Sequence, residues 1–195
     1  LVRLFKFMGK RKFLDVPGYT ILICLYFFLI WMKGSKTFRE CNAVITRAEL
    51  VKARHNWGQG LIAISAAYEN EGINKAIQVT SDLLDSIYGF DLAPVLFKPT
   101  LSGGEQTFRT TKRGALSYFV GHDARFPDDT GFGLKGWREV KSQTASAFFD
   151  GNVAMWMGWI FCIDKFGEMT KVDKSFGYKK GSDGVLKIVL HHSSI

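Results

Sequence analysis

Residues 137–164 read WREVKSQTASAFFDGNVAMWMGWIFCID, two runs rich in aromatic and β-branched residues on either side of Asp150-Gly151. Such runs favour the extended backbone, and Asp-Gly between them is a strong signal for a tight hairpin turn. The stretch therefore predicts two long antiparallel strands, 137–150 and 152–164.

The same pattern of strand-like runs separated by turn residues continues toward the end of the chain. KFGEMT at 165–170 and GSDG at 181–184 separate two more runs, KVDKSFGYKK at 171–180 and VLKIVLHHSS at 185–194. We expect these runs to be strands joined by hairpin connections, and we expect another strand upstream at GALSYFVG, residues 114–121. Together they predict a meander of antiparallel strands.

The preceding part of the chain has helical periodicity. Thr46 with Glu49 three residues later is a capping box, and the apolar positions that follow recur at helical spacing until Gly72: Ala53, Trp57, Leu61, Ile64 and Tyr68. A second amphipathic stretch stops at Gly89 and carries Ala76, Thr80, Leu83, Leu84 and Ile87 on one face.

Two helices followed by strands predict an α+β fold in which the helices cover one face of a strongly curved antiparallel sheet. Such a sheet closes into a cone whose mouth is a natural ligand pocket.

The charge of the chain is concentrated at its front. The whole chain has a formal charge of +8, but residues 1–36 hold seven Lys or Arg against one acid, Asp15, so that residues 37–195 carry only +2. A nearly neutral body gives no electrostatic reason to expect a nucleic-acid partner.

The front segment itself resembles a targeting signal. Lys10-Arg11-Lys12 precede fourteen uncharged residues, Tyr19–Met32, which are too few for a comfortable spanning helix. We expect residues 1–36 to be a signal or anchor that contacts a membrane or the translocon, with Met8 as a sensible initiator, and residues 37–195 to be the functional domain. The alternatives are translated non-coding sequence and an integral part of the fold.

The sequence contains no common catalytic or metal-binding motif. Cys24, Cys41 and Cys162 have no disulfide or zinc spacing. Asp128 and Asp129 in FPDDTGF supply adjacent carboxylates, which are more typical of a solvated turn or a helix cap than of a metal site.

The end of the last predicted strand is unusually polar. Alternation along the strand places His191 with Ser193 on one face and His192 with Ser194 on the other. The apolar row Leu186, Ile188 and Leu190 continues into His192 and Ser194, although a bulge would exchange the two faces. Buried polar groups need hydrogen-bond partners. We therefore expect the polar end of this strand to lie close to other hydroxyl residues that occur within apolar sequence, namely Thr100, Ser117 and Tyr118.

Several motifs, in order along residues 55–194, resemble the iota-class carbonic anhydrases of diatoms, other algae and bacteria. They are LFKPTL, FRTTKRGALSYFVGHD, FPDDTGFGLKGW and SFGYKK-SDG-LKIVLHHSS. The resemblance implies an NTF2-like fold, related to the association domain of calcium/calmodulin-dependent kinase II and to SnoaL-like enzymes, and it implies reversible hydration of CO2 to bicarbonate.

The resemblance also implies a site. Thr100, Tyr118 and Ser193 would hold a water, with Ser194 as the alternative serine, and CO2 would rest against Leu116, Phe119 or Trp159. His191 or His192 would carry the proton, because imidazole titrates near neutrality. No metal is required in this interpretation. The alternative is Mn²⁺ or Zn²⁺ on one of these histidines, with a further ligand such as His122 or an acid.

Two other functions remain open at this point. A SnoaL-type or ketosteroid-isomerase-like enzyme would need an Asp or Glu base in the cone, and a non-catalytic association module would use the sheet to assemble. We expect a homodimer or a higher homo-oligomer, in a plastid or another compartment reached by the secretory route, or in the periplasm. In the family a proline usually follows the serine pair after one residue, so we also expect the natural chain to continue past Ile195.

Overall fold

The computed structural model describes residues 44–195. The predicted leader, residues 1–36, lies outside the described residues. Among the described residues no helix has the length and apolar character needed to cross a membrane.

The helical half begins and ends as predicted. Helix α2 spans Arg47–Glu71, and the capping box at its start is formed: Thr46 Oγ1 accepts from the Glu49 amide at 3.2 Å, while the Thr46 amide donates to Glu49 at 2.8 Å. Gly72, at φ +83°, ends the helix and leads directly into α3, Ile73–Ile87. A left-handed backbone of this kind favours glycine, which explains why one residue suffices to turn the chain between two helices.

The strand half is a single five-stranded sheet in the order β1-β5-β4-β3-β2. The strands are β1 Leu96–Lys98, β2 Trp137–Asp150, β3 Val153–Asp164, β4 Met169–Lys180 and β5 Leu186–Ser194. The hairpin predicted from residues 137–164 is confirmed, since β2 and β3 pair antiparallel from Trp137 with Asp164 to Asp150 with Val153. The sheet is mixed, because the short strand β1, which the pattern did not reveal, runs parallel to β5.

The prediction of a strand at 114–121 was wrong. These residues form helix α4, Lys112–Val120, with Thr111 as its side-chain cap and Gly121 at its end. A short apolar run does not distinguish a buried helix from a buried strand by periodicity, and the cap in the preceding threonines was the signal that would have decided it. The helix buries Ala115, Ser117, Tyr118 and Phe119.

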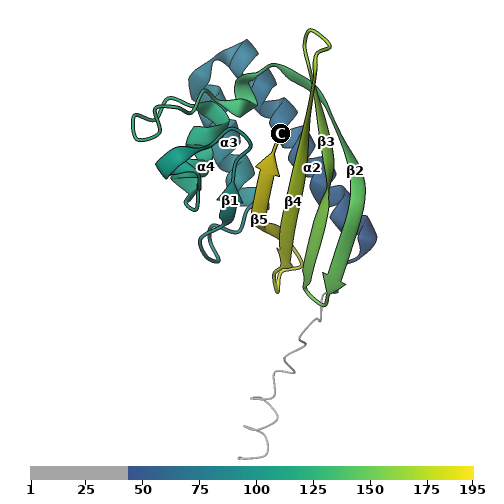
Figure 1. Ribbon diagram of the computed structural model, residues 1–195. Coiled ribbons are helices and arrows are strands. Elements are labelled where there is room, and N and C mark those ends of the chain that lie inside the picture. Colours follow the sequence, from purple (N-terminus) through teal and green to yellow (C-terminus); the bar gives the residue numbers. More distant parts are fainter. Residues whose placement is uncertain (1–43) are drawn as a thin grey trace, which may run out of the picture. The chain divides into compact units, whose positions relative to one another are not determined.

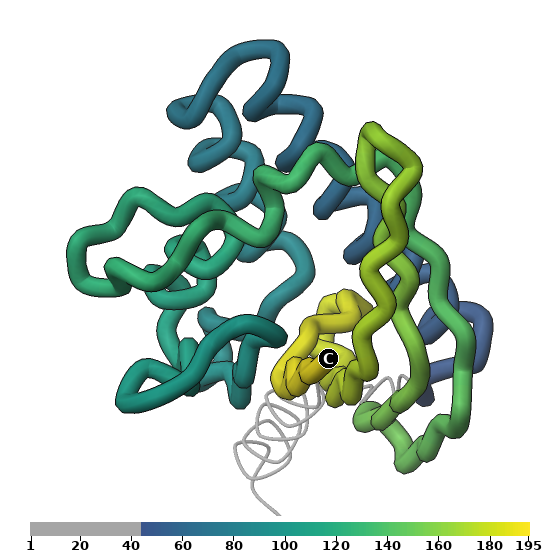
Figure 2. The backbone as a smooth tube through the Cα atoms, turned by 45° about the horizontal axis from the view of Figure 1, so that its top comes forward, coloured from purple at the N-terminus to yellow at the C-terminus, as the bar shows by residue number. Residues whose placement is uncertain are grey.

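The helices lie on one face of the sheet, and the C-terminal strand β5 lies between the long strands β2–β4 and the segment that carries β1 and α4 (Figures 1 and 2). Helix α2 packs closely on the sheet: a Cβ added at Gly58 would lie 3.0 Å from the side chain of Val140 on β2. Large side chains, including Trp57, Trp156 and Phe176, fill the space between the two layers. The fold is therefore the expected α+β arrangement of helices on a curved sheet.

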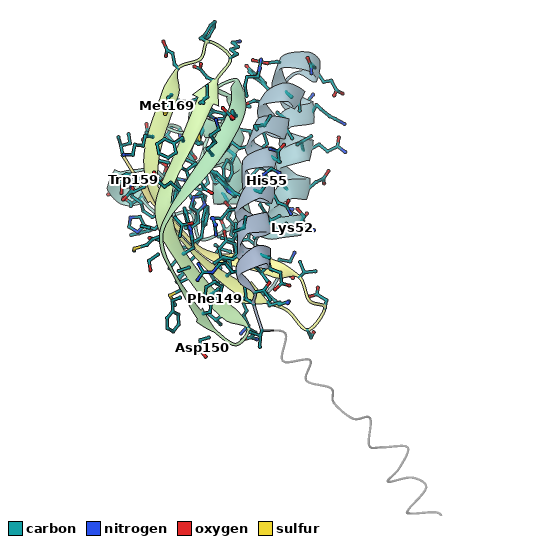
Figure 3. The ribbon with its side chains drawn as sticks, turned by 90° about the vertical axis from the view of Figure 1, so that its right-hand side faces the viewer. Lys52, His55, Phe149, Asp150, Trp159 and Met169 are labelled. Carbon is teal, nitrogen blue, oxygen red and sulfur yellow. The ribbon has the colours of Figure 1, made fainter. Side chains whose placement is uncertain are left out.

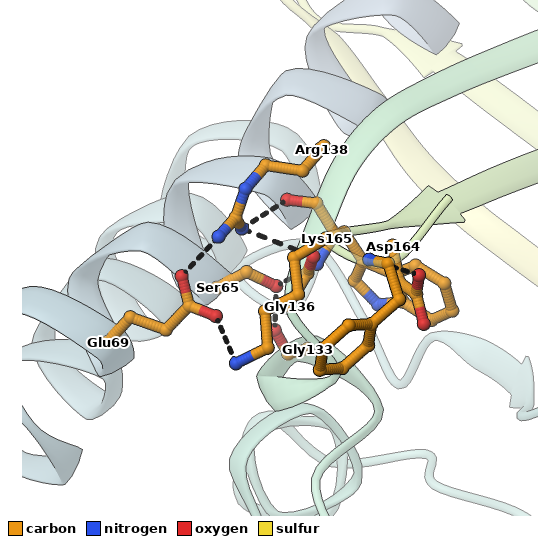
Figure 4. A network of polar contacts seen from close by, with 9 residues as sticks. Ser65, Glu69, Gly133, Gly136, Arg138, Asp164 and Lys165 are labelled. Atoms are coloured by element: carbon orange, nitrogen blue, oxygen red, sulfur yellow. Dashed lines mark hydrogen bonds and ion pairs between the residues drawn. The ribbon is translucent and has the colours of Figure 1, made fainter. Parts of the chain in front are cut away.

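A polar network anchors the C-terminal part of α2 to the start of the sheet (Figure 4). The Ser65 hydroxyl donates to the Gly133 carbonyl at 2.6 Å and accepts from the Trp137 amide at 2.9 Å. Glu69 pairs with Arg138 at 2.6 Å and with Lys165 at 3.2 Å. These contacts fix the short 3-10 helix Phe132–Leu134 and the first residue of β2 against the helix.

Candidate functional site

A bulge in β5 decides which face of its polar end is buried. Tyr178 on β4 pairs with Ile188, and the next residue, Gly177, pairs with Leu190, so that Val189 is the extra residue. Beyond this bulge the inward row changes from Ile188 to His191 and Ser193, which are 1% and 0% exposed. The more regular apolar row, which continues into His192 and Ser194, therefore does not reach the interior. The face that carries His191 and Ser193 does.

The buried serine belongs to a directed chain of hydrogen bonds. Thr100 follows β1, and because β1 runs parallel to β5, its hydroxyl lies 2.7 Å from that of Ser193. The Ser193 hydroxyl lies 3.0 Å from the carbonyl oxygen of Asp173. A carbonyl oxygen only accepts, so Ser193 donates to Asp173 and Thr100 donates to Ser193.

Tyr118 reaches the same place from α4. Its side chain lies next to Thr100 and Leu101, is 5% exposed, and leaves the hydroxyl without a hydrogen-bond partner of good geometry. Burial raises the pKa of this phenol to about 12, although the neighbouring Thr100 hydroxyl partly opposes the shift. Tyr118 therefore keeps its proton at neutral pH and has a free donor in a buried position.

His191 lies inside an aromatic enclosure. Its ring stacks on Phe97 with centroids 4.4 Å apart and contacts Phe176 at 4.7 Å. Nδ1 lies 2.9 Å from the Tyr88 hydroxyl, and Nε2 lies 2.9 Å from the amine of Lys174. Burial, followed by the charges of Lys174 and His192, holds the pKa of His191 well below its usual range, so the imidazole is neutral at physiological pH.

Lys174 is a buried residue of this cluster that the sequence analysis did not single out. Its side chain is 4% exposed, and burial lowers the pKa of its amine to about 7. The available signal was the inward row Val172, Lys174, Phe176 of the predicted strand 171–180, in which one lysine interrupts apolar residues. Lysine is almost never buried without a partner, so this position could have been singled out.

The buried amine should show in the pH dependence of stability. From pH 7 to 10.5, between its folded and its ordinary pKa, only the unfolded chain keeps the Lys174 proton, so the free energy of unfolding rises with pH. We expect Lys174→Met to lose this rise, as measured by urea denaturation at several pH values. Because burial also raises the pKa of Cys162 to about 11, which lowers stability at high pH, the informative quantity is the difference between wild type and variant. Parallel curves would contradict the prediction.

Three of the predicted site residues do not join this cluster. Trp159 lies on the face of the sheet turned away from α2 (Figure 3), where the Lys171 amine sits 3.9 Å from its ring centre. His192 is exposed, and Ser194 hydrogen-bonds the Asp173 carboxylate at 2.7 Å. Of the apolar residues, Phe119 is fully buried on α4 and packs on Phe97 at 6.0 Å, while Leu116 is partly buried.

The two adjacent carboxylates of the FPDDTGF motif differ in their surroundings. Asp129 forms a buried ion pair with Arg109 at 2.9 Å, and Asp128 is exposed. Across residues 44–195 no group of three or more His, Cys, Asp and Glu side chains has an arrangement that could hold a metal ion. Two cavities of about 650 and 670 Å³ lie elsewhere, between α2, α3 and β5 and along β2–β5 respectively.

Comparison with known proteins gives a consistent result. Residues 48–195 match the family model described as metal-independent carbonic anhydrase. The metal-independent carbonic anhydrase of Nostoc sp. strain PCC 7120 is 45% identical over 154 residues, which are 79% of this chain and 75% of that protein. The crystal structure of a cyanobacterial iota-carbonic anhydrase in complex with bicarbonate aligns with a TM-score of 0.78 and 44% identity, over 78% of this chain and 93% of that one.

A more distant likeness, with a TM-score of 0.43 and 20% identity, is to a putative calcium/calmodulin-dependent protein kinase II association domain from Xanthomonas campestris, over 77% of this chain and 88% of that one. The family match over most of the chain and the 45% identical relative carry the assignment. The chain belongs to the metal-independent carbonic anhydrase family.

Proposed function

We propose that this chain catalyses the reversible hydration of CO2 to bicarbonate at the cluster of Thr100, Tyr118 and Ser193, without a metal ion. The observation that carries the proposal is the directed hydrogen-bond chain from Thr100 through Ser193 to the Asp173 carbonyl, next to the unpartnered hydroxyl of Tyr118. The family name supports the metal-free chemistry.

The direction of these hydrogen bonds determines how a water molecule would bind. The hydroxyl proton of Thr100 is donated to Ser193, and that of Ser193 is donated to the Asp173 carbonyl. The two hydroxyl oxygens can therefore only accept hydrogen bonds from a water molecule. A water that donates its hydrogens to these oxygens keeps its own lone pair free. That lone pair is the nucleophile in CO2 hydration, so the cluster orients the water for attack.

Tyr118 supplies the complementary group. Its O–H is buried without a hydrogen-bond partner and stays protonated at neutral pH, so it is available to donate to a ligand. A donor of this kind stabilises negative charge that develops on a CO2 oxygen as the C–O bond forms. The aromatic rings next to Tyr118, Phe97 and Phe132, each with its centroid 5.6 Å from that of Tyr118, provide apolar surface suited to a nonpolar substrate.

Orientation alone does not complete the reaction. Holding two reactants in place can remove about 7–11 kcal/mol of barrier in ideal cases, but the attacking water must also lose a proton. The sequence predicted His191 or His192 for that role. His192 is exposed, and both ring nitrogens of His191 already have partners, which leaves His191 poorly placed to receive the proton alone.

The isomerase-like alternative would need an acid in the cone that is free to act as a base. The carboxylate of Asp129 is buried and its charge acts on Tyr118, but it is already paired with the Arg109 guanidinium at 2.9 Å. Assembly into a homo-oligomer stays a prediction, as do the plastid, secretory-route and periplasmic locations, which depend on residues 1–36.

Stopped-flow measurement of CO2 hydration by the full chain tests the proposal. We expect catalysis above the buffer rate, and we expect the rate to survive dialysis against EDTA, because the proposed groups are all side chains and backbone. Absence of catalysis in a preparation that is folded by circular dichroism would refute the function. Loss of catalysis with EDTA and its return with Mn²⁺ or Zn²⁺ would refute the metal-free chemistry.

A further inference from the structure

Lys174 is a buried basic group without a carboxylate partner. Among the described residues its amine has one hydrogen-bond partner, Nε2 of His191 at 2.9 Å, and it lies 4.9 Å from the centre of the Trp57 ring. An ammonium ion in such surroundings is costly unless it is paired. Burial therefore favours the free amine, which has a lone pair to offer, although the face of the Trp57 ring attracts the ammonium.

The neighbouring hydrogen bonds distinguish the two protonation states. Trp57 Nε1 only donates, and it donates to the Tyr88 hydroxyl at 3.0 Å. The Tyr88 proton then points to His191 Nδ1, which places the ring proton on Nε2, facing the Lys174 amine. In this arrangement every group has a partner only if the amine accepts, that is, if Lys174 is unprotonated.

Protonation of Lys174 reverses the direction of the hydrogen bonds from Tyr88 through His191 to Lys174. An ammonium donates to Nε2, so the ring proton moves to Nδ1 and points at Tyr88, whose own proton is left without a partner among these groups. A buried unpaired donor costs about 1–3 kcal/mol. The hydrogen bonds of Tyr88 and His191 thus stabilise the unprotonated form of Lys174. The amine can accept a proton, and the protonated form releases it readily.

Lys174 is also next to the proposed reaction site. In the β4–β5 register Lys174 is the direct partner of Ser193, and both side chains are buried on the same face of the sheet. Directly opposed side chains in an antiparallel pair have Cβ atoms about 4.5–5.5 Å apart. The base is thus one strand away from the hydroxyl that holds the water.

We propose that Lys174 is the proton acceptor of CO2 hydration and that His191 is the positioning residue that keeps its amine in the accepting state. The inference rests on the proposed function. In the forward step the water turns one O–H from the Ser193 oxygen to the Lys174 amine; this O–H bond breaks as the new C–O bond forms bicarbonate, and the proton ends on the amine as ammonium. The ammonium then releases the proton to solvent, which restores the free amine.

The charges around Lys174 suit this role. Burial is the main influence on its pKa; Cys162 on β3 and Asp173 on β4 raise the pKa, whereas Lys98 on β1 lowers it. His191 faces it from β5, and α2 contributes the uncharged Trp57. The resulting pKa of about 7 is close to the value at which a general base works best at neutral pH.

The test is the pH profile of kcat/KM for CO2 hydration by the full chain. For the wild type we expect the rate to rise with pH through an inflection near 7. For Lys174→Met and Lys174→Gln we expect a loss of about 10²-fold or more, no inflection near 7, and partial rescue by imidazole buffer. Lys179→Met is the matched control, because Lys179 is an exposed lysine of the same strand, and it should keep the wild-type profile.

The outcomes separate this inference from the proposed function. An inactive wild type refutes the function itself. An active wild type whose Lys174 variants keep both the inflection and the rate refutes only the role of Lys174. If neither variant folds, ¹⁵N NMR of the lysine amines in the wild type decides: a buried amine that titrates near 7 supports the inference, and lysines that all titrate near 10 overturn it.

Discussion

Thr100→Val is expected to lower kcat/KM for CO2 hydration by about 10²- to 10³-fold while leaving the fold intact. The substitution preserves the shape of the side chain but removes the hydroxyl that donates to Ser193 at 2.7 Å and that would accept a hydrogen bond from the attacking water. Loss of one preorganised polar group at a reacting centre typically costs this much in rate. Stopped-flow hydration assays at saturating and subsaturating CO2 measure the effect.

Ser193→Ala and Tyr118→Phe should have losses of the same order, for different reasons. Without Ser193 the Thr100 proton has no acceptor in the chain and competes for the water, whereas without the Tyr118 hydroxyl the developing charge on CO2 loses its donor. Because Thr100 and Ser193 act as one hydrogen-bonded unit, the double variant Thr100→Val/Ser193→Ala should be little slower than either single variant.

Thr80→Val is the matched control for this series. Thr80 is a fully buried threonine whose hydroxyl donates to the Ala76 carbonyl at 2.7 Å inside α3. Its substitution should change stability about as much as Thr100→Val does, yet leave the hydration rate near that of the wild type. Near wild-type rates in all three site variants would show that the reaction takes place elsewhere in the molecule.

The parts of the fold that were predictable from sequence are those set by local signals. The capping box at Thr46 and Glu49, the stop at Gly72 and the Asp150-Gly151 turn each act within a few residues, and the structure has all three where they were expected. Residues 114–121 were misread because a short apolar run fits a buried strand as well as a buried helix, and the local helix cap at Thr111 was not recognised.

The site was partly predictable for the same reason. Thr100, Ser193 and Tyr118 were named from motifs, and the structure brings them together. The pattern left the face of β5 open, because the face depends on a bulge opposite Gly177, where a Cβ would lie 2.9 Å from that of Leu190. Lys174 was overlooked, since its contact with His191 on another strand cannot be read from the pattern of its own strand.

The second large effect is expected at the buried ion pair of Arg109 and Asp129. The side chains are 2% and 5% exposed, and the guanidinium meets the carboxylate through two bonds, of 2.9 and 3.3 Å. The Arg109 amide also donates to the Phe97 carbonyl of β1 at 2.8 Å. The pair therefore connects the loop that carries Asp129 to the strand that leads into Thr100.

Asp129→Ala should lower the free energy of unfolding by about 3–5 kcal/mol, because it leaves a buried guanidinium without its counter-ion. Urea denaturation of the full chain measures the change, and Arg109→Met/Asp129→Leu, which removes both charges, should recover most of it. Asp123→Ala is the control, since its partner Arg113 is 55% exposed and the loss should be far smaller. Equal losses at Asp123 and Asp129 would contradict the argument. If the pair also positions Thr100, folded Asp129→Ala should hydrate CO2 more slowly than wild type, whereas a purely structural pair would change stability alone.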